Sequence, residues 1–141
     1  MITYVDTSSL LKLIVEEEGS DQAASIWASA DILTSIVLVE VEARAALAAA
    51  RRGQRLDEQG LTKSKAELNL LLANLHMVDV TDGLISESCI LAEEEGLRGY
   101  DAVHLAAAIT VQATVFTSSD AVLCAAAERR GVYVANPIWR G

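Results

Sequence analysis

Aromatic residues, proline and cysteine are scarce in this chain of 141 residues. A single proline (Pro137) and eight glycines exclude a collagen-like or linker-rich organisation. The longest apolar runs are a few residues, far short of the ~18–20 that cross a bilayer, and the start, MITYVD, lacks the basic segment of a signal peptide. The two cysteines, Cys89 and Cys124, lie in apolar stretches, which favours reduced thiols over a disulfide. These absences predict a cytoplasmic protein that does not enter a membrane.

Apolar residues, by contrast, are plentiful. They make up 52% of the chain and give a mean hydropathy of +0.30, so the chain can bury a full core and is not disordered. A length of 141 residues fits one domain, and we expect residues 1–141 to form it. Twenty acidic residues against eleven basic ones give a net charge of −9, which argues against a protein that binds nucleic acid over its whole surface.

Basic residues are concentrated in one stretch. Residues 44–65 carry six of the eleven bases and only two acids, a local net charge of +4. Two interpretations are open: a helical hairpin whose charges are simply solvated, or a surface that contacts the phosphates of a nucleic acid. The second interpretation selects four arginines as candidate contacts: Arg44, Arg51, Arg52 and Arg55.

Short apolar, β-branched runs alternate with helical patterns along the whole chain. Strands are expected at 2–5, 32–35, 77–80, 114–117 and 132–135. Helices are expected at 10–15, 20–31, 37–52, 58–74, 85–95, 100–112 and 120–130. No two strands are joined by a hairpin turn, so we expect an α/β fold, with a short parallel sheet of about four to five strands and helices on both faces. Such sheets bind ligands beyond the carboxyl ends of their strands.

Four acidic residues follow strands or open helices in this arrangement. Asp6 directly follows the first strand, and Asp120 comes shortly after the fourth. Glu40 lies in the first turns of the helix after the second strand, and Asp101 opens a helix that is otherwise almost entirely apolar. Taken singly, each has a structural explanation: the aspartates as helix N-caps, and Glu40 as a partner of Arg44. Taken together, they converge on one edge of the sheet.

A convergence of carboxylates points to a bound cation. Carboxylates within ~4–6 Å repel one another and raise one another's pKa, and a divalent cation relieves that conflict. An all-oxygen site favours Mg²⁺ or Mn²⁺ over zinc. The isolated cysteines and the widely separated His76 and His104 offer no zinc site, and we interpret His104, on its apolar helix, as a buried structural histidine.

Four segments carry a resemblance to a known family. They are YVDTSSLLKL, TSIVLVEVEARAAL, GYDAVHLAAA and FTSSDAVLCAAAERRGVYVANP. In this order and spacing they resemble the PIN-domain family, and within it the VapC-like toxins of bacterial toxin–antitoxin pairs. The resemblance covers nearly the whole chain and implies a PIN-like three-layer fold.

The resemblance also implies roles for single residues. The family's four metal-binding acids match Asp6, Glu40, Asp101 and Asp120, with Asp6 and Asp101 as the principal ligands. Two hydroxyls of the family's pattern match Thr7 and Ser118, where many relatives carry threonine at the second position. These two would orient a carboxylate or a water, although both could also simply cap helices.

Glu42 is an alternative to Glu40. The two glutamates lie about 200° apart around their helix, so only one of them can face the site. The family register and the pairing with Ser35 favour Glu40.

The function that the resemblance implies is that of a metal-dependent endoribonuclease. Mg²⁺ or Mn²⁺ would activate a water that attacks the RNA phosphodiester, and the four arginines would contact RNA phosphates. The resemblance further implies a toxin that inhibits translation and growth until its cognate antitoxin binds, and a homodimer.

Three other interpretations remain open from the residues. One is a PIN-like nuclease that processes RNA without a toxin role. Another is a phosphatase or receiver-like phosphate-binding domain, also built from acids after strands, although the lysine that a receiver needs near its last strand has no counterpart after Lys65. The third, an inactive interaction module, is disfavoured by four intact acids.

Overall fold

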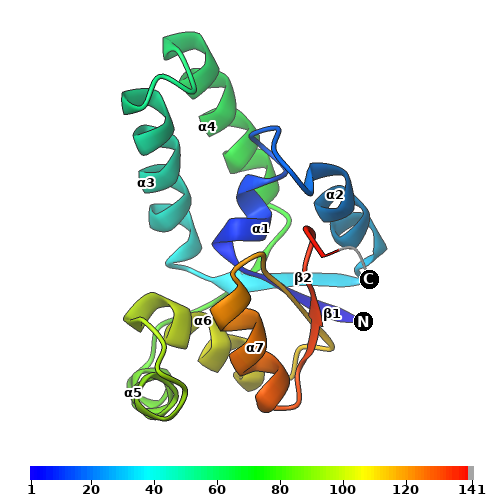
Figure 1. Ribbon diagram of the computed structural model, residues 1–141, viewed down its shortest axis with the longest axis vertical. Helices are drawn as coiled ribbons and strands as arrows, with labels where there is room; N and C mark the ends of the chain where they lie inside the picture. The colour runs from blue at the N-terminus through cyan, green and yellow to red at the C-terminus, as the bar shows by residue number, and fades with distance from the viewer. Residues whose placement is uncertain (140–141) are drawn as a thin grey trace.

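Five short parallel strands form one sheet in the computed structural model, which describes residues 1–139 (Figure 1). The strands are β1 (Ile2–Val5), β2 (Ile32–Ile36), β3 (His76–Val78), β4 (Val115–Thr117) and β5 (Tyr133–Ala135). They lie in the order β3-β2-β1-β4-β5, and every neighbouring pair is parallel. The α/β fold expected from the alternating pattern is confirmed.

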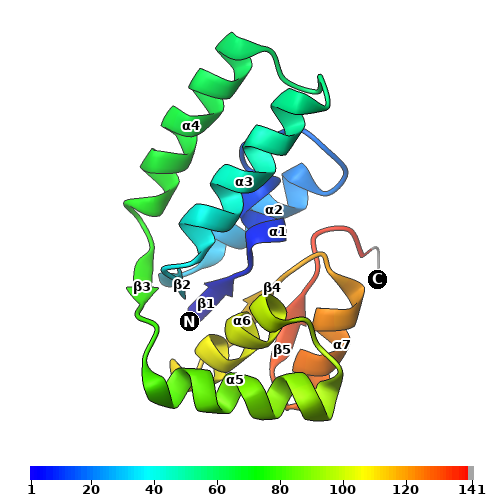
Figure 2. The same cartoon turned by 90° about the vertical axis from the view of Figure 1, so that its left-hand side faces the viewer.

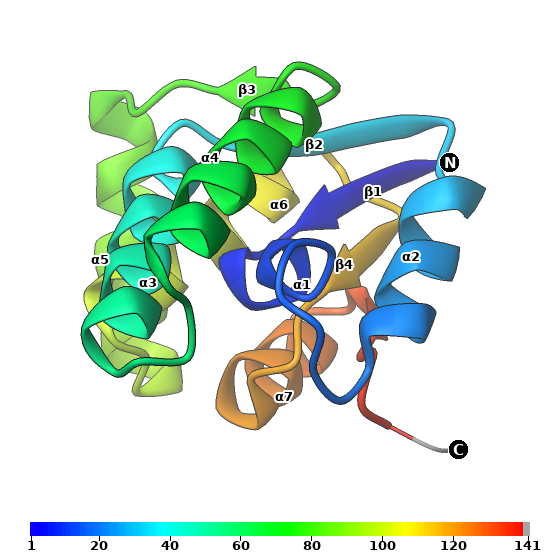
Figure 3. The ribbon, with the colours of Figure 1, turned by 90° about the horizontal axis from the view of Figure 1, so that it is seen from above.

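Helices cover both faces of the sheet. They are α1 (Thr7–Leu11), α2 (Ser20–Ser29), α3 (Val39–Arg52), α4 (Glu58–Leu72), α5 (Asp82–Glu95), α6 (Gly99–Thr110) and α7 (Ala121–Arg129). The first four lie on one face and the last three on the other, so the fold has the expected three layers (Figure 1 and Figure 3). None of these helices, within residues 1–139, combines the length and the apolar character that a membrane span requires.

Helix α1 begins earlier than the sequence predicts. The backbone carbonyl of Asp6 accepts hydrogen bonds from the amides of Ser9 and Leu10, so the helix starts at Thr7 and not at Leu10. The hydroxyls of residues 7–9 bond to other side chains, most of them distant in the chain. Asp6 occupies the N-cap position, but its side chain makes no capping hydrogen bond. Its carboxylate is therefore left for other contacts.

The central strand β1 contributes to the hydrophobic cores on both faces of the sheet. Tyr4 faces α5–α7 and stacks on Phe116, with ring centroids 5.5 Å apart and ring planes at 9°. Its neighbour Val5 packs into the opposite core, with residues of α1, α3 and α4. Helix α6 is buried without interruption from Ala102 to Ala108. Because four of these side chains are single methyl groups, the helix can lie close to the sheet.

The strand order creates a topological switch point between β1 and β4. The chain adds β2 and β3 on one side of β1, and β4 and β5 on the other. Parallel sheets bind ligands at such a point, outside the carboxyl ends of the strands. Asp6 follows β1 there, and Ser118 follows β4. The antiparallel pair of α3 and α4 projects beyond the sheet (Figure 2).

Candidate active site

Asp6 is held in a fixed orientation at the switch point. Its side chain is buried, and its Oδ2 accepts hydrogen bonds from Ser8 Oγ at 2.7 Å and Ser118 Oγ at 2.8 Å. Each serine oxygen in turn accepts a backbone amide, Ser119 N–H for Ser8 and Asp120 N–H for Ser118. The single proton of each hydroxyl is therefore free to point at Asp6. This arrangement leaves Oδ1 of Asp6 to face the rest of the site.

The second acid of the site is Glu42, in the place where the family register puts Glu40. Glu42 Oε1 accepts hydrogen bonds from Thr7 Oγ1 at 3.0 Å and from His104 Nε2 at 2.6 Å. The Glu40 side chain is 55% exposed, and its nearest basic partner is Arg44 at 3.9 Å. The expected orientation of Glu40 toward the other acids is thus corrected.

The geometry of α3 explains why the sequence of the helix alone does not decide between Glu40 and Glu42. The buried stripe of α3 consists of Val39, Ala43, Leu47 and Ala50. At about 100° per residue, Glu40 and Glu42 flank this stripe on opposite sides. Which flank faces Asp6 depends on how α3 packs against α1 and the sheet. In the structure, the flank that carries Glu42 faces Asp6, because both side chains lie beside His104 Nε2.

His104 lies among the acids, where we expected only a structural histidine. It is 1% exposed, its Nε2 lies 3.5 Å from Asp6 Oδ1, and its Nδ1 lies 2.8 Å from the Tyr4 hydroxyl. One signal in the sequence could have indicated this placement: His104 follows Asp101 by three residues and so shares its helix face.

The Glu42–His104 pair stabilises the charged form of both partners. Burial acts to lower the pKa of His104, but the hydrogen bond to Glu42 and the nearby Asp6 carboxylate outweigh burial and raise this pKa. Burial likewise acts to raise the pKa of Glu42, but the bond from His104 and the hydroxyl of Thr7 lower it. Glu42 is therefore a carboxylate at neutral pH.

Asp101 and Asp120 complete the group of acids. Burial, followed by the charges of Asp120 and Asp6, raises the pKa of Asp101. Arg98 compensates little, because its side chain is 87% exposed and lies 3.8 Å away. Asp120 caps α7, its Oδ1 accepting the amide of Leu123 at 3.0 Å. Its other oxygen, Oδ2, is not needed for this cap.

The donor set of this group fits a divalent cation. Within residues 1–139, no three acidic, histidine or cysteine side chains already stand together as a metal cage. The carboxylates of Asp6, Glu42, Asp101 and Asp120 nevertheless form an all-oxygen set of the kind that Mg²⁺ prefers. The raised pKa of Asp101 shows that its charge is not fully compensated by the protein. A cation would supply that compensation and draw the carboxylates together.

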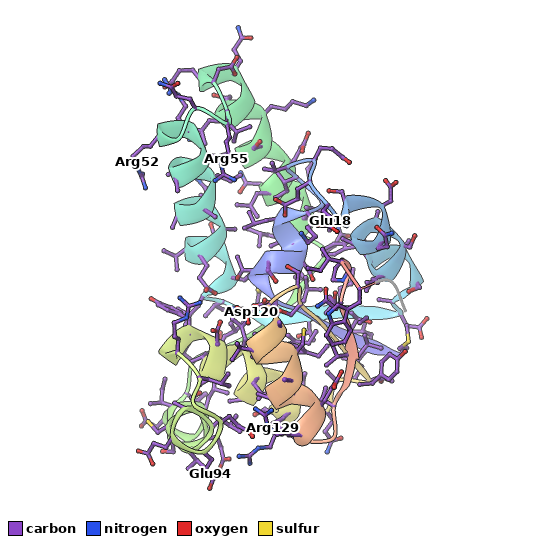
Figure 4. All side chains as sticks on the ribbon, in the orientation of Figure 1. Glu18, Arg52, Arg55, Glu94, Asp120 and Arg129 are labelled. Carbon is purple, nitrogen blue, oxygen red and sulfur yellow. The ribbon has the colours of Figure 1, made fainter. Side chains whose placement is uncertain are left out.

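The four arginines lie in different surroundings. Arg44 donates to Asn69 Oδ1 at 3.2 Å, and Arg51 Nε lies 3.0 Å from Glu58 Oε1. In the part of the chain that the structure describes, Arg52 and Arg55 have no acidic partner within 4.0 Å. Both lie at the far end of the α3–α4 pair, well away from Asp120 at its base (Figure 4).

A hollow is lined both by Arg55 and by a serine that bonds to Asp6. It has a volume of about 200 Å³ and lies between α1 and α3. Besides Arg55 it is lined by Ser8, which donates to Asp6, and by Ser119, whose amide donates to Ser8. Its walls combine apolar side chains, Leu11 and Ala50 among them, with the acidic side chain of Glu17.

Comparisons with known proteins agree with this fold. The family profile described as PIN domain matches residues 3–129, and the chain belongs to the PIN-domain family. Ribonuclease VapC49 of Mycobacterium tuberculosis is 37% identical over 110 residues, which span 78% of this chain and 76% of that protein. The chain is thus a VapC-like member of the family, whose PIN domains are nucleases and generally depend on a divalent metal.

Two solved structures share the fold at lower identity. PAE2754 from Pyrobaculum aerophilum has a TM-score of 0.72 and 23% identity, and the match covers 95% of this chain and 83% of that one. A toxin–antitoxin complex from Klebsiella pneumoniae has a TM-score of 0.69 and 16% identity, with coverage of 96% and 97%.

The raised pKa of Asp101 predicts a stabilising substitution. Because the folded protein disfavours ionised Asp101, its charge costs stability at pH 7, and the cost disappears as the pH falls and the carboxyl is protonated in both states. We expect Asp101→Asn to raise the Tm of the protein in EDTA at pH 7, by about 4 °C for each kcal/mol regained, and to raise it less at pH 4. Thermal unfolding followed by circular dichroism measures both values. Glu40→Gln, at an exposed site, should leave the Tm nearly unchanged; a lower Tm for Asp101→Asn would contradict the repulsion.

Proposed function

We propose that the chain is a single-domain, Mg²⁺-dependent endoribonuclease and the toxin of a toxin–antitoxin pair. The observation that carries the nuclease proposal is the group of Asp6, Glu42, Asp101 and Asp120 at the switch point of the sheet. Membership of the PIN-domain family supports it. We place the activity in the cytoplasm, where RNA is available and two free thiols remain reduced.

Asp6 and Asp101 would be the principal ligands of Mg²⁺, with Glu42 and Asp120 completing the site directly or through water. The ion, when bound, lowers the pKa of a coordinated water and neutralises charge on the scissile phosphate. The hydroxyls of Ser8 and Ser118 hold Asp6, and that of Thr7 holds Glu42. Thr7 and Ser118 thus act as orienting groups.

The proton of the attacking water needs an acceptor among the acids. Glu42 and Asp120 each use one oxygen in the hydrogen bonds described above, which leaves Glu42 Oε2 and Asp120 Oδ2 as acceptors. Attack by water breaks the bond to the 3′ oxygen, and the products carry a 5′-phosphate and a 3′-hydroxyl. The catalytic group we propose is therefore Asp6, Glu42, Asp101 and Asp120, with Glu40 replaced by Glu42.

RNA would approach from the basic end of α3. Outside the four acids of the site the net charge is still −5, so the surface repels RNA on average and a local positive region is needed. Arg52 and Arg55 supply one, and the hollow that Arg55 lines is also lined by Ser8 and Ser119 next to the acids. We propose that these two arginines bind phosphates that flank the scissile bond.

Two protein partners belong to the proposal. The toxin–antitoxin complex from Klebsiella pneumoniae supports an antitoxin partner. We propose that this antitoxin is small and that a segment of it covers the acids with a basic side chain. A second copy of the chain would cover the exposed apolar side chains Ile85 and Tyr100, which line a hollow together with Leu38 and Cys89. Light scattering should then give twice the monomer mass of 15.0 kDa; the monomer mass would refute the dimer.

The first prediction of this proposal concerns the choice between the two glutamates. Asp6→Asn and Glu42→Gln should each abolish RNA cleavage in Mg²⁺, because they remove carboxylates of the site, and EDTA should abolish cleavage by the unaltered protein. Glu40→Gln is the matched control and should cleave normally. Gel analysis of a labelled RNA measures cleavage in every case. Normal cleavage by Glu42→Gln together with loss of cleavage in Glu40→Gln would show that Glu40 is the acid of the site, as the resemblance to the family implies.

The second prediction concerns the arginines. The double variant Arg52→Ala, Arg55→Ala should bind RNA more weakly. The slope of log affinity against log salt concentration should become shallower, by about 0.7 for each phosphate of a single strand that the variant no longer neutralises. Arg44→Ala and Arg51→Ala serve as controls, since those side chains already have protein partners. Filter binding at several salt concentrations measures the slope, in a Glu42→Gln background that prevents cleavage. An unchanged slope would mean that the hairpin is a solvated surface.

The third prediction concerns the toxin role. Expression of the chain should arrest the growth of a suitable host, and co-expression of the neighbouring gene should restore growth. Expression of Glu42→Gln, which removes one carboxylate of the site, should be harmless. If the unaltered chain is also harmless while purified protein cleaves RNA, the toxin role is refuted and the nuclease proposal stands.

A further inference from the structure

One buried polar side chain interrupts the apolar run of α6. His104 is 1% exposed and lies among Val103, Leu105 and four alanines in the buried residues of this helix. A polar group in such a position costs stability unless it is hydrogen-bonded. Both ring nitrogens of His104 are bonded, and neither bond is needed to build the helix.

The direction of these bonds follows from the partners. The carboxylate of Glu42 can only accept, so the proton between Glu42 Oε1 and His104 Nε2, 2.6 Å apart, lies on the ring nitrogen. The Tyr4 hydroxyl at 2.8 Å from Nδ1 can donate or accept and therefore suits the ring in either charge state. His104 consequently presents an N–H to Glu42 whatever its own charge.

Glu42 has little else to hold it. It lies on a flank of α3 next to solvent, with its side chain 23% exposed, and its only other hydrogen-bond partner in the described residues is Thr7. A glutamate side chain has several rotatable bonds, so fixing it toward Asp6 requires a specific contact. His104 of α6 supplies that contact through Nε2. Tyr4 of β1 holds the imidazole ring through its hydrogen bond to Nδ1.

We propose that His104 is a positioning residue that holds the Glu42 carboxylate on the Asp6 side of α3, ready for the metal ion. This inference rests on the proposed function, since it takes Glu42 as an acid of the site. It assigns His104 a role through Glu42 and none in contact with RNA. Tyr4 serves the same role one step further away, by fixing the imidazole ring.

Two amide variants separate this role from simple filling of the core. In His104→Gln the side-chain amide reaches the depth of Nε2 and can still donate to Glu42, whereas in His104→Asn it reaches only the depth of Nδ1, near Tyr4. Both are polar and smaller than imidazole, and asparagine is one methylene shorter than glutamine, so the Tm of each variant is measured alongside to account for the larger cavity. Tyr4→Phe removes one hydroxyl and keeps the ring stacked on Phe116.

The measurement is Mn²⁺ binding to each folded variant, by calorimetry without RNA. We expect His104→Asn to weaken Mn²⁺ binding about 10–100-fold, the usual effect of losing a group that orients a metal ligand. His104→Gln should stay close to the unaltered protein, and Tyr4→Phe should lie between the two. In cleavage assays, His104→Asn should lower kcat at fixed Mg²⁺ and leave the KM for RNA unchanged.

The outcomes distinguish this inference from the proposed function. Equal Mn²⁺ affinity in His104→Asn and the unaltered protein would overturn the positioning role, and so would equal losses in His104→Gln and His104→Asn at matched Tm. If the unaltered protein neither binds Mn²⁺ nor cleaves RNA, the proposed function itself fails. The expected pattern is that His104→Gln keeps the Mn²⁺ affinity of the unaltered protein and that His104→Asn loses it.

Discussion

Repulsion among carboxylates at one edge of the sheet is the constraint on which the rest of the site depends. Asp6, Asp101 and Asp120 come from three separate segments, and the raised pKa of Asp101 records burial and the charges of the other two. Within residues 1–139, no arginine or lysine is buried among them, and Arg98, beside Asp101, is largely exposed. The buried His104 offsets these charges only in part, since the pKa of Asp101 stays raised. The fold therefore keeps an unfavourable arrangement in place, and a divalent cation is the species that would make it favourable.

Three of the four acids are each fixed by a different kind of neighbour. Asp6 is held by two serine hydroxyls whose own acceptor positions are filled by backbone amides. Asp120 is held by the start of its helix, and Glu42 by Thr7 and His104. Hydroxyls, a backbone amide and one imidazole thus orient these carboxylates without a lysine or arginine, so that each keeps an oxygen for a ligand. Preorganisation of this kind is what a metal-dependent phosphodiesterase needs.

The two layers of helices contribute differently to function. Helix α6 packs closely because of its alanines, and it carries Asp101 and His104 to the sheet edge. Helix α3 and its partner α4 extend away from the sheet and carry the basic residues outward (Figure 2 and Figure 4). One layer therefore supplies much of the acidic site, and the other links that site to a surface of opposite charge. A protein with a net charge of −9 needs such a local separation of charge to bind RNA.

The local sequence pattern was enough to predict the alternating strands and helices and the parallel sheet. It also predicted the places of Asp6, Asp101 and Asp120 in the fold, because each aspartate lies at the end of an element that its neighbours in sequence define. The choice of Glu42 over Glu40 needed the tertiary structure. Both flank the same buried stripe of α3, and the partners that select Glu42 lie 35 and 62 residues away, in α1 and α6. The same holds for His104 and for the arginines that are already paired. A side chain's direction is decided by what packs against its helix, and that is a property of the folded chain.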